Sequence, residues 1–508
     1  MNWENSSYHP QSPKPIYSRF DTVFAWLCFL FGFLFCQAVP VTEHPLGGLL
    51  LILALYITGF VIVSVNKVKL SAACILSTAF SLIISAALIL SESSFLLRLS
   101  YAYCLASYCY FLYTAFGNNA EKGFSDYISL DYINALFVFP LQAMTTVFSA
   151  ISTKFTKKGS QFLLKILIGC GITIIPTALV FGFLSYDAGF LAILNRIFSF
   201  DSSAVFRLIR NLLFAVPLGM YGFGVYDASH NGTAHRKLTT EAFQQKLQAV
   251  KRLPQITAVV AVLPILFLYV VFFISQWQYY ISGFTGVLPE NFSYAEYARH
   301  GFFQLCAVSV INLLLIVFIS IFIRRGDQNS SIVLNILAVV FCLFTLILIS
   351  TAVSKLIMYI HYYGLTQKRI YAMWLMTLIA ILFLVIALGQ FLPKMRVIAL
   401  SAAITIVMFG ALGLCNVNTL TAQYNADRYL AGTLQSVDIA QMERLGDSAV
   451  PALVKIAGEM DAQKDPELKA DIDGILSKRS LELEQKKGSV FRWNLPAALA
   501  RRALQKYQ

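Results

Sequence analysis

The sequence predicts an all-α integral membrane protein with about eleven transmembrane helices, interfacial amphipathic helices and a small helical domain at the C-terminal end. Two observations favour this fold class. Of the 508 residues, 58% are hydrophobic and 13% are charged, whereas soluble domains have about 45–50% apolar and about 25% charged residues. The apolar residues also gather in runs of about 20, the length that crosses the hydrocarbon core of a bilayer. A chain of several soluble domains is therefore excluded.

Eleven apolar runs are long enough to span a bilayer, and each is followed by a polar loop. A run of this length with few charges is the usual signature of a transmembrane helix. The predicted spans are Phe24–Val41, Leu46–Val65, Ser71–Leu90, Phe95–Phe116, Ile166–Tyr186, Phe206–Tyr226, Ile256–Ser275, Phe302–Ile323, Ile332–Ala352, Tyr371–Phe391 and Val397–Cys415.

A twelfth run, Ile133–Ile151, is amphipathic rather than apolar all round. Its large apolar side chains recur at helical spacing on one side, while Asn134, Gln142 and Thr145 take the other side. Such a one-sided stripe is typical of a helix that lies in the membrane interface. Leaving this run out of the span count places most loop Lys and Arg residues on the cytoplasmic side, as the positive-inside rule requires. We therefore predict a cytoplasmic N-terminus and an extracytoplasmic C-terminus.

Composition divides the chain into three regions. Residues 1–120 are predicted as a four-helix membrane unit, residues 121–415 as the main membrane domain with about seven spans and interfacial helices, and residues 416–508 as a polar helical domain. In the polar domain, Asp447 is predicted to cap a helix over Ala449–Met460. Asp465-Pro466-Glu467 has the residue types of an N-cap and a first helical turn. The parity of the span count places this domain on the outer side.

Positive charge is spread over the loops and the tail. The formal net charge is +13, but no patch is dense enough to suggest nucleic acid, so the predicted partners are the bilayer and its anionic lipids. Six cations lie beside predicted spans or on a basic amphipathic segment, where they would face the inner leaflet. These candidates for anionic-lipid contact are Lys154, Lys157, Lys158, Lys246, Lys251 and Arg252. Ordinary positive-inside anchoring is the simpler alternative.

A second polar group falls on the predicted outer side, in residues 277–303 and 355–369. Both stretches combine tyrosines with cations. Ionisable groups at this depth are costly and are usually paired or functional. We predict a cationic, tyrosine-lined site for an anionic lipid or small ligand, and the alternative is an interfacial belt with one Glu296–Arg299 ion pair. The candidate residues are Tyr294, Glu296, Arg299, Lys355, Tyr359, His361, Tyr363, Thr366 and Arg369.

Five stretches carry a recognisable family pattern. They are Leu184–Phe190, Tyr294–Arg299 with Gly301–Phe303, Tyr359–Arg369, Ala422–Asn425 with Arg428-Tyr429, and Asp447–Leu453. In order and spacing, over roughly residues 130–455, they resemble a family of bacterial polytopic membrane proteins called domain of unknown function 4153, with 4173 its close relative. The resemblance implies a multi-pass protein of the bacterial plasma (inner) membrane. It implies no particular reaction.

The sequence contains no common catalytic motif. There is no HExxH, GxSxG or P-loop pattern, and the nine cysteines lie in apolar runs without metal-ligand spacing. We therefore predict no catalytic residue, no metal and no cofactor. A non-catalytic protein that binds, and by extension transports, an anionic ligand is favoured. Two alternatives stay open: an assembly or signalling subunit with a protein partner at residues 416–508, and a membrane-embedded transferase using His361 or Glu296.

Overall fold

The computed structural model describes residues 16–38, 43–121, 123, 125–152, 180, 183–184, 187, 189–190, 202–234, 237–275, 302–324, 328–460, 465–485 and 489–507. Within these ranges the regular secondary structure is helical, apart from one isolated parallel β-bridge between Leu253 and Ile323. Nine helices in this part of the chain are long and apolar enough to cross a membrane. The predicted all-α, multi-pass membrane fold is therefore confirmed.

The nine helices coincide with nine of the eleven predicted spans. They are Arg19–Gln37, Pro45–Val65, Ala72–Leu90, Ser94–Ala115, Gln255–Ser275, Phe302–Phe322, Ile332–Tyr363, Gln367–Phe391 and Val397–Leu414. Of the other two, Phe206–Tyr226 is helical within α11 (Ser202–Asn231), although α11 is not among the nine. The run Ile166–Tyr186 lies almost entirely outside the described residues.

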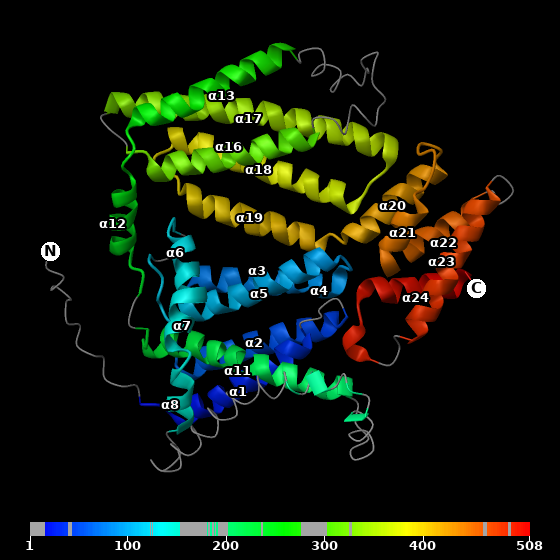
Figure 1. Cartoon of the computed structure of the whole chain (residues 1–508), viewed down its shortest axis with the longest axis horizontal. Helices are drawn as coiled ribbons and strands as arrows, with labels where there is room; N and C mark the ends of the chain where they lie inside the picture. The colour runs from blue at the N-terminus through cyan, green and yellow to red at the C-terminus, as the bar shows by residue number, and fades with distance from the viewer. Residues whose placement is uncertain are drawn as a thin grey trace. The chain divides into compact units, whose positions relative to one another are not determined.

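Contacts divide the chain into two compact units. Unit 1 comprises residues 1–81, 102–123 and 129–238. It contains α1 (Arg19–Ala38), α2 (Pro45–Val65), most of α3 (Ala72–Ser85) and α5 (Ser94–Ala115), and α11. Figure 1 shows α1 and α11 side by side, and glycines explain how closely they pack: a Cβ on Gly32 would lie 2.5 Å from the Ala215 carbonyl oxygen, and one on Gly219 would lie 2.6 Å from Phe29 Cδ1.

The amphipathic segment of unit 1 is broken into short helices. These are α6 (Ile128–Ile133), a π-turn over Asn134–Val138, α7 (Phe139–Ala143) and α8 (Thr146–Ser152), with a 53° bend before α8. Near its start, Asn134 Oδ1 accepts from the Leu238 N–H at 3.1 Å, beyond the end of α11. Near its end, the Ala150 carbonyl accepts from Thr22 Oγ1 at 2.9 Å, in the first turn of α1.

Unit 2 comprises residues 82–101, 124–128 and 239–508. Its membrane part contains α4 (Ala87–Leu90), α13 (Gln255–Ser275), α16 (Phe302–Phe322), α17 (Gln328–Tyr363), α18 (Gln367–Phe391) and α19 (Val397–Leu414). In Figure 1, α13, α16, α17, α18 and α19 run side by side, and α12 (Thr240–Val250) crosses beside their ends. A shared apolar core that includes Val262, Phe341 and Phe383 holds α13, α16, α17 and α18 together.

The last helices of unit 2 have a core of their own. They are α20 (Val417–Leu430), α21 (Ile439–Arg444), the 3-10 turn η2 (Gly446–Ala449), α22 (Val450–Glu459), α23 (Pro466–Gln485), the 3-10 turn η4 (Val490–Arg492) and α24 (Leu495–Tyr507). Met442, Leu453, Ile456, Ile472 and Leu504 are among the buried residues of this core. We call these helices the C-terminal helical domain.

One predicted cap in this domain is correct and one is wrong. Asp465 caps α23 as expected, because its Oδ1 accepts from the Leu468 N–H at 3.1 Å. Asp447 does not cap α22, since it lies within η2 and the residue at the N-cap is Ala449, which offers no side-chain hydrogen bond. Two backbone donors before α22 bond instead to the side chain of Glu92, which is distant in sequence.

Candidate functional site

The described part of the predicted outer-face site lies at the turn between α17 and α18. Gly364 has a φ of +73°, which favours glycine, and lets the chain reverse. The next residue, Leu365, is held by Asn425 of α20, which accepts from its N–H at 2.6 Å and donates to its carbonyl at 2.9 Å. Gln441 Nε2 donates to the same carbonyl at 2.8 Å. The C-terminal helical domain thus fixes this turn through two side-chain amides.

Two arginines satisfy the last carbonyls of α17. Arg428 of α20 donates through Nη1 to the carbonyl of His361 at 2.8 Å. Arg369 of α18 donates to the carbonyls of Tyr363, at 3.0 Å, and Gly364, and its guanidinium carbon lies 4.1 Å from the centre of the Tyr359 ring. Cations stabilise the C-terminal end of a helix dipole. Both arginines therefore act first as caps of α17.

The structure brings together only some of the predicted outer-face residues. Tyr359, Tyr363 and Arg369 are neighbours, because the two tyrosine rings lie 5.1 Å apart and Arg369 contacts both residues. Thr366 caps α18 by accepting from the Arg369 N–H at 3.3 Å. Lys355 lies one turn before Tyr359 on α17, and His361 is exposed. The remaining candidates, Tyr294, Glu296 and Arg299, lie outside the described residues.

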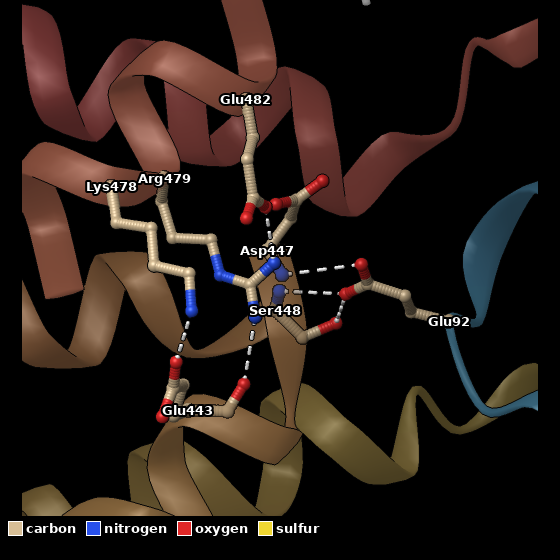
Figure 2. A network of polar contacts seen from close by, with 7 residues as sticks. All are labelled: Glu92, Glu443, Asp447, Ser448, Lys478, Arg479 and Glu482. Carbon is tan, nitrogen blue, oxygen red and sulfur yellow. Dashed lines mark hydrogen bonds and ion pairs between the residues drawn. The ribbon is translucent and has the colours of Figure 1, made fainter.

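A polar contact that the sequence did not indicate joins the α4–α5 turn to the C-terminal helical domain. Glu92 accepts from the backbone N–H of Asp447 at 3.2 Å, and from the N–H and Oγ of Ser448 at 2.9 and 3.0 Å. Figure 2 shows this carboxylate facing the turn before α22. Gly446 is required there, since it has a φ of +72° and a Cβ would lie 2.7 Å from Glu92 Oε1. Burial, together with the nearby Asp447 carboxylate, raises the pKa of Glu92.

Charged residues of α21 and α23 surround the same turn (Figure 2). Arg479 donates to Glu482 Oε2 at 2.7 Å and to the Glu443 carbonyl at 2.8 Å. Lys478 forms an ion pair with the Glu443 carboxylate at 2.7 Å, and its hydrogen bond lowers the pKa of Glu443. Glu92 could have been singled out from the sequence, because it is the only acidic residue between Glu43 and Glu121. The partner of Glu92 could not, since Asp447 is 355 positions away.

A cleft of about 280 Å³ lies at the opposite end of the unit 2 spans from the α17–α18 turn. Its lining combines the polar side chains of Lys251, Ser320, Asn335 and Gln390 with an otherwise largely apolar wall. The lining residues are Lys251, Ala258, Val262, Ile316, Ile319, Ser320, Ile323, Leu334, Asn335, Leu337, Ala338, Phe341 and Gln390. This combination, with a few polar groups over an apolar wall, is typical of sites for amphiphilic ligands. We call it the Lys251 cleft.

The segment that carries Lys251 is pinned to the end of α16. The Leu253 N–H donates to the Phe322 carbonyl at 3.2 Å, and the Arg324 N–H donates to the Leu253 carbonyl at 3.0 Å. The helix α12 comes before this bridge. Thr239 caps it by accepting from the Ala242 N–H, and none of the residues of α12 is buried. The basic amphipathic segment is therefore helical, and the bridge that follows it fixes the chain two residues after Lys251.

The other predicted lipid contacts differ in placement. Lys246 is exposed on α12 and does not line the cleft. Arg252 is also exposed, and its Nε donates to the Ala249 carbonyl at 2.7 Å. Lys154, Lys157 and Lys158 lie outside the described residues. Among the three predicted lipid contacts that the structure describes, Lys251 is thus the one that lines this cleft.

Unit 1 contains buried carboxylates that the sequence reasoning also missed. Asp227 is fully buried and accepts from Asn231, Thr233 and Tyr17 at 2.7, 2.9 and 3.2 Å. Asp21 accepts from Tyr226 at 2.5 Å. Neutral donors on α11, just before α1 and just after α11 therefore satisfy both groups. Among the described residues, no three His, Cys, Asp or Glu side chains are grouped so as to hold a metal ion.

Comparison with known proteins places the chain in a family. The family model described as "Domain of unknown function (DUF4153)" matches residues 70–456, which includes Glu92, the Lys251 cleft and the α17–α18 turn. The chain belongs to the DUF4153 family. This DUF4153 protein matches no curated protein and no solved structure. Its established description is therefore that of a multi-pass membrane protein with a domain of unknown function.

Proposed function

We propose that this DUF4153 protein is a non-catalytic protein of the bacterial plasma membrane that binds an anionic lipid, with the Lys251 cleft as the binding site. The observation that carries the proposal is the presence of one cation, Lys251, in the lining of a largely apolar cleft between four membrane helices. A lipid phosphate would meet the Lys251 ammonium and the amides of Asn335 and Gln390. The acyl chain would follow the apolar wall that Val262 and Phe341 provide.

The proposed orientation puts the Lys251 cleft at the cytoplasmic leaflet. The loops at this end carry most of the loop cations, and anionic lipids give the cytoplasmic leaflet a negative surface potential. The N-terminus is then cytoplasmic and the C-terminal helical domain extracytoplasmic. Lys246 and Arg252, which are exposed beside the cleft, would contact neighbouring headgroups without entering it.

The outer-face residues support a second contact with the same class of ligand. Arg369 stacks on Tyr359 beside the half-exposed Tyr363, and amphipathic tyrosines favour the headgroup level of a bilayer. With Lys355, His361 and Thr366 nearby, and with Tyr294, Glu296 and Arg299 predicted to join them, this set would receive a lipid phosphate on the outer side. A lipid contact at each end of the spans is the arrangement that transport of the lipid would require.

Native mass spectrometry of the full chain tests the proposal. The protein is exchanged into nanodiscs of phosphatidylglycerol or of phosphatidylcholine, and the retained lipid is counted after release into detergent. One cation near an anionic surface contributes about 1 kcal/mol, so Lys251→Gln should weaken phosphatidylglycerol retention about fivefold. Filling the cleft through Ala338→Phe should abolish it.

Lys246→Gln is the matched control, because it removes an equal charge from α12 without touching the cleft. It should leave retention nearly unchanged. Equal losses in Lys251→Gln and Lys246→Gln, with no loss in Ala338→Phe, would mean that the cations serve only general anchoring. Retention that depends on Arg369 and not on Lys251 would move the binding site to the outer face.

A further inference from the structure

The C-terminal helical domain has a groove of about 430 Å³ between α20, α22 and α24. Its floor is apolar and is formed mainly by side chains from α22 and α24. Its lining residues are Thr419, Gln423, Ser448, Pro451, Val454, Lys455, Pro496, Leu499, Arg502, Ala503 and Lys506. The groove therefore has an apolar floor, a polar end and a cationic edge.

The cationic edge has little acidic counterpart. Lys455 comes from α22, and Arg502 and Lys506 lie one helical turn apart on α24. No acidic residue lines the groove, although Lys455 forms an exposed ion pair with Asp427 at 2.8 Å. In the sequence, residues 486–507 contain six cations and no Asp or Glu. The charge of the groove therefore favours an occupant that carries negative charge.

The shape of the groove favours a helix over a small anion. Its lining runs from Pro496 to Lys506 on α24, about 15 Å at 1.5 Å per residue, and from Pro451 to Lys455 on α22, about 6 Å. Val454 and Leu499 lie along this floor, and Leu499 is 37% exposed. An amphipathic helix of about three turns would cover these side chains with its apolar face, which is a common mode of peptide recognition. A free phosphate would leave them exposed.

We propose that this groove binds an acidic amphipathic helix of a partner protein. The apolar face of that helix would lie on Val454 and Leu499, and its acidic residues would pair with Arg502 and Lys506. Ser448 lines the groove and is also one of the two residues that donate to Glu92. The partner would therefore dock beside the contact that ties this domain to the α4–α5 turn.

Site-specific photo-crosslinking in cells that naturally produce the protein tests the proposal. The full chain carries a photoreactive phenylalanine analogue at Leu499 or, as a control, at Leu481, which is 65% exposed on α23 and does not line the groove. We expect Leu499 alone to capture a peptide whose acidic residues recur every three or four positions. Replacing Arg502 and Lys506 by Glu should lower the yield at least tenfold, and replacing the acidic residues of the captured peptide by Lys should restore it.

A charge control separates loss of binding from loss of folding. Arg444→Glu reverses an exposed cation of α21 outside the groove and should leave the yield unchanged. Hydrogen exchange in α22 should be the same in the reversed-charge variant and the unmodified chain. A phospholipid adduct at Leu499, a cross-link only to this chain's own residues, equal capture at Leu481, or no capture at all would each overturn the proposal.

Discussion

Substituting Gly446 by Ala should detach Glu92 from the turn before α22. Gly446 has a φ of +72°, and a Cβ at this position would lie 2.7, 2.8 and 3.0 Å from Glu92 Oε1, Cδ and Oε2. These contacts are too short for a methyl group, so the carboxylate must move away from the Asp447 and Ser448 donors. Gly432 is the matched control, because its φ is +69° and nothing lies within 4 Å of a Cβ there.

The expected magnitude follows from two terms. An alanine in the left-handed region costs about 1 kcal/mol, and both substitutions include this cost. Hydrogen bonds to a charged group contribute about 1.5–3 kcal/mol each, but water can replace much of what is lost at this partly buried turn, so we count about 2 kcal/mol in total for the three bonds to Glu92. Gly446→Ala should therefore cost about 3 kcal/mol, whereas Gly432→Ala should cost about 1 kcal/mol.

Hydrogen exchange of the α22 amides in the full-length protein in detergent micelles measures this difference. Because 1.4 kcal/mol corresponds to a factor of ten, exchange should accelerate about a hundredfold in Gly446→Ala and about fivefold in Gly432→Ala. In a Glu92→Ala background, the additional effect of Gly446→Ala should fall to that of Gly432→Ala. An effect of Gly446→Ala that equals the control, or that is unchanged without Glu92, would refute the reasoning.

Three further outcomes are expected. The folded protein raises the pKa of Glu92, so it holds this proton more tightly than the unfolded chain does. The stability of the docked turn should therefore fall as pH rises from the ordinary glutamate range through the raised pKa. Hydrogen exchange in α22 should show this pH dependence in the unmodified chain and lose it in Glu92→Gln. Gly32→Ala should lower the thermal stability of the protein because its Cβ would meet the Ala215 carbonyl of α11, whereas Gly458→Ala, with open space and a helical position, should stabilise by up to about 1 kcal/mol. In a variant without native cysteines, Ser94→Cys and Gln435→Cys should each react with an impermeant thiol reagent from the same side of sealed vesicles. Labelling from opposite sides would contradict the docking of the C-terminal helical domain at the α4–α5 turn.

The membrane fold could be predicted because the signal is local. Each run of about 20 apolar residues identifies a span without knowledge of its neighbours, and nine predicted spans reappear among the described helices. The cap at Asp465 was also predictable, because the donor at Leu468 is three residues away. The contact between Glu92 and the backbone at Asp447 was not predictable. An Asp before a helix has the same local sequence whether it caps that helix or its backbone N–H bonds to a residue far away in the chain.

Arg369 illustrates a second limit of prediction from the sequence. Arg369 was predicted to bind a ligand because it is a cation beside tyrosines at the end of a span. In the structure it contacts carbonyls at the end of α17, five and six residues earlier in the chain. A helix C-terminus followed by a tight turn and an arginine has this arrangement, so the sequence supports a helix cap as readily as a ligand site. The Lys251 cleft depends on four separate helices, and no local pattern could have indicated it.

Contacts between loops also constrain the course of the chain through the membrane. The Asp126 carboxylate accepts from the N–H groups of Ile398 and Ala399 at 3.0 Å, and Gln244 donates to the Tyr127 hydroxyl. Loops that touch lie on one side of the bilayer, so the chain must cross it an even number of times between them. If Ile166–Tyr186 and Phe206–Tyr226 both cross, a third crossing between Tyr127 and Gln244 would make the number odd.

The broken helices α6, α7 and α8 are the candidate for this third crossing. Their own contacts also indicate that they do not cross the bilayer. Asn134, directly after α6, bonds to the chain beyond the end of α11, and Ala150, near the end of α8, bonds to the first turn of α1. The start of α1 and the end of α11 are themselves joined by the hydrogen bond between Tyr226 and Asp21. A segment whose two ends both contact the same end of a helix pair begins and ends at the same depth in the membrane. Both arguments favour an interfacial or re-entrant course for Ile133–Ile151, and with it the assignment of the C-terminal helical domain and the α4–α5 turn to a common side.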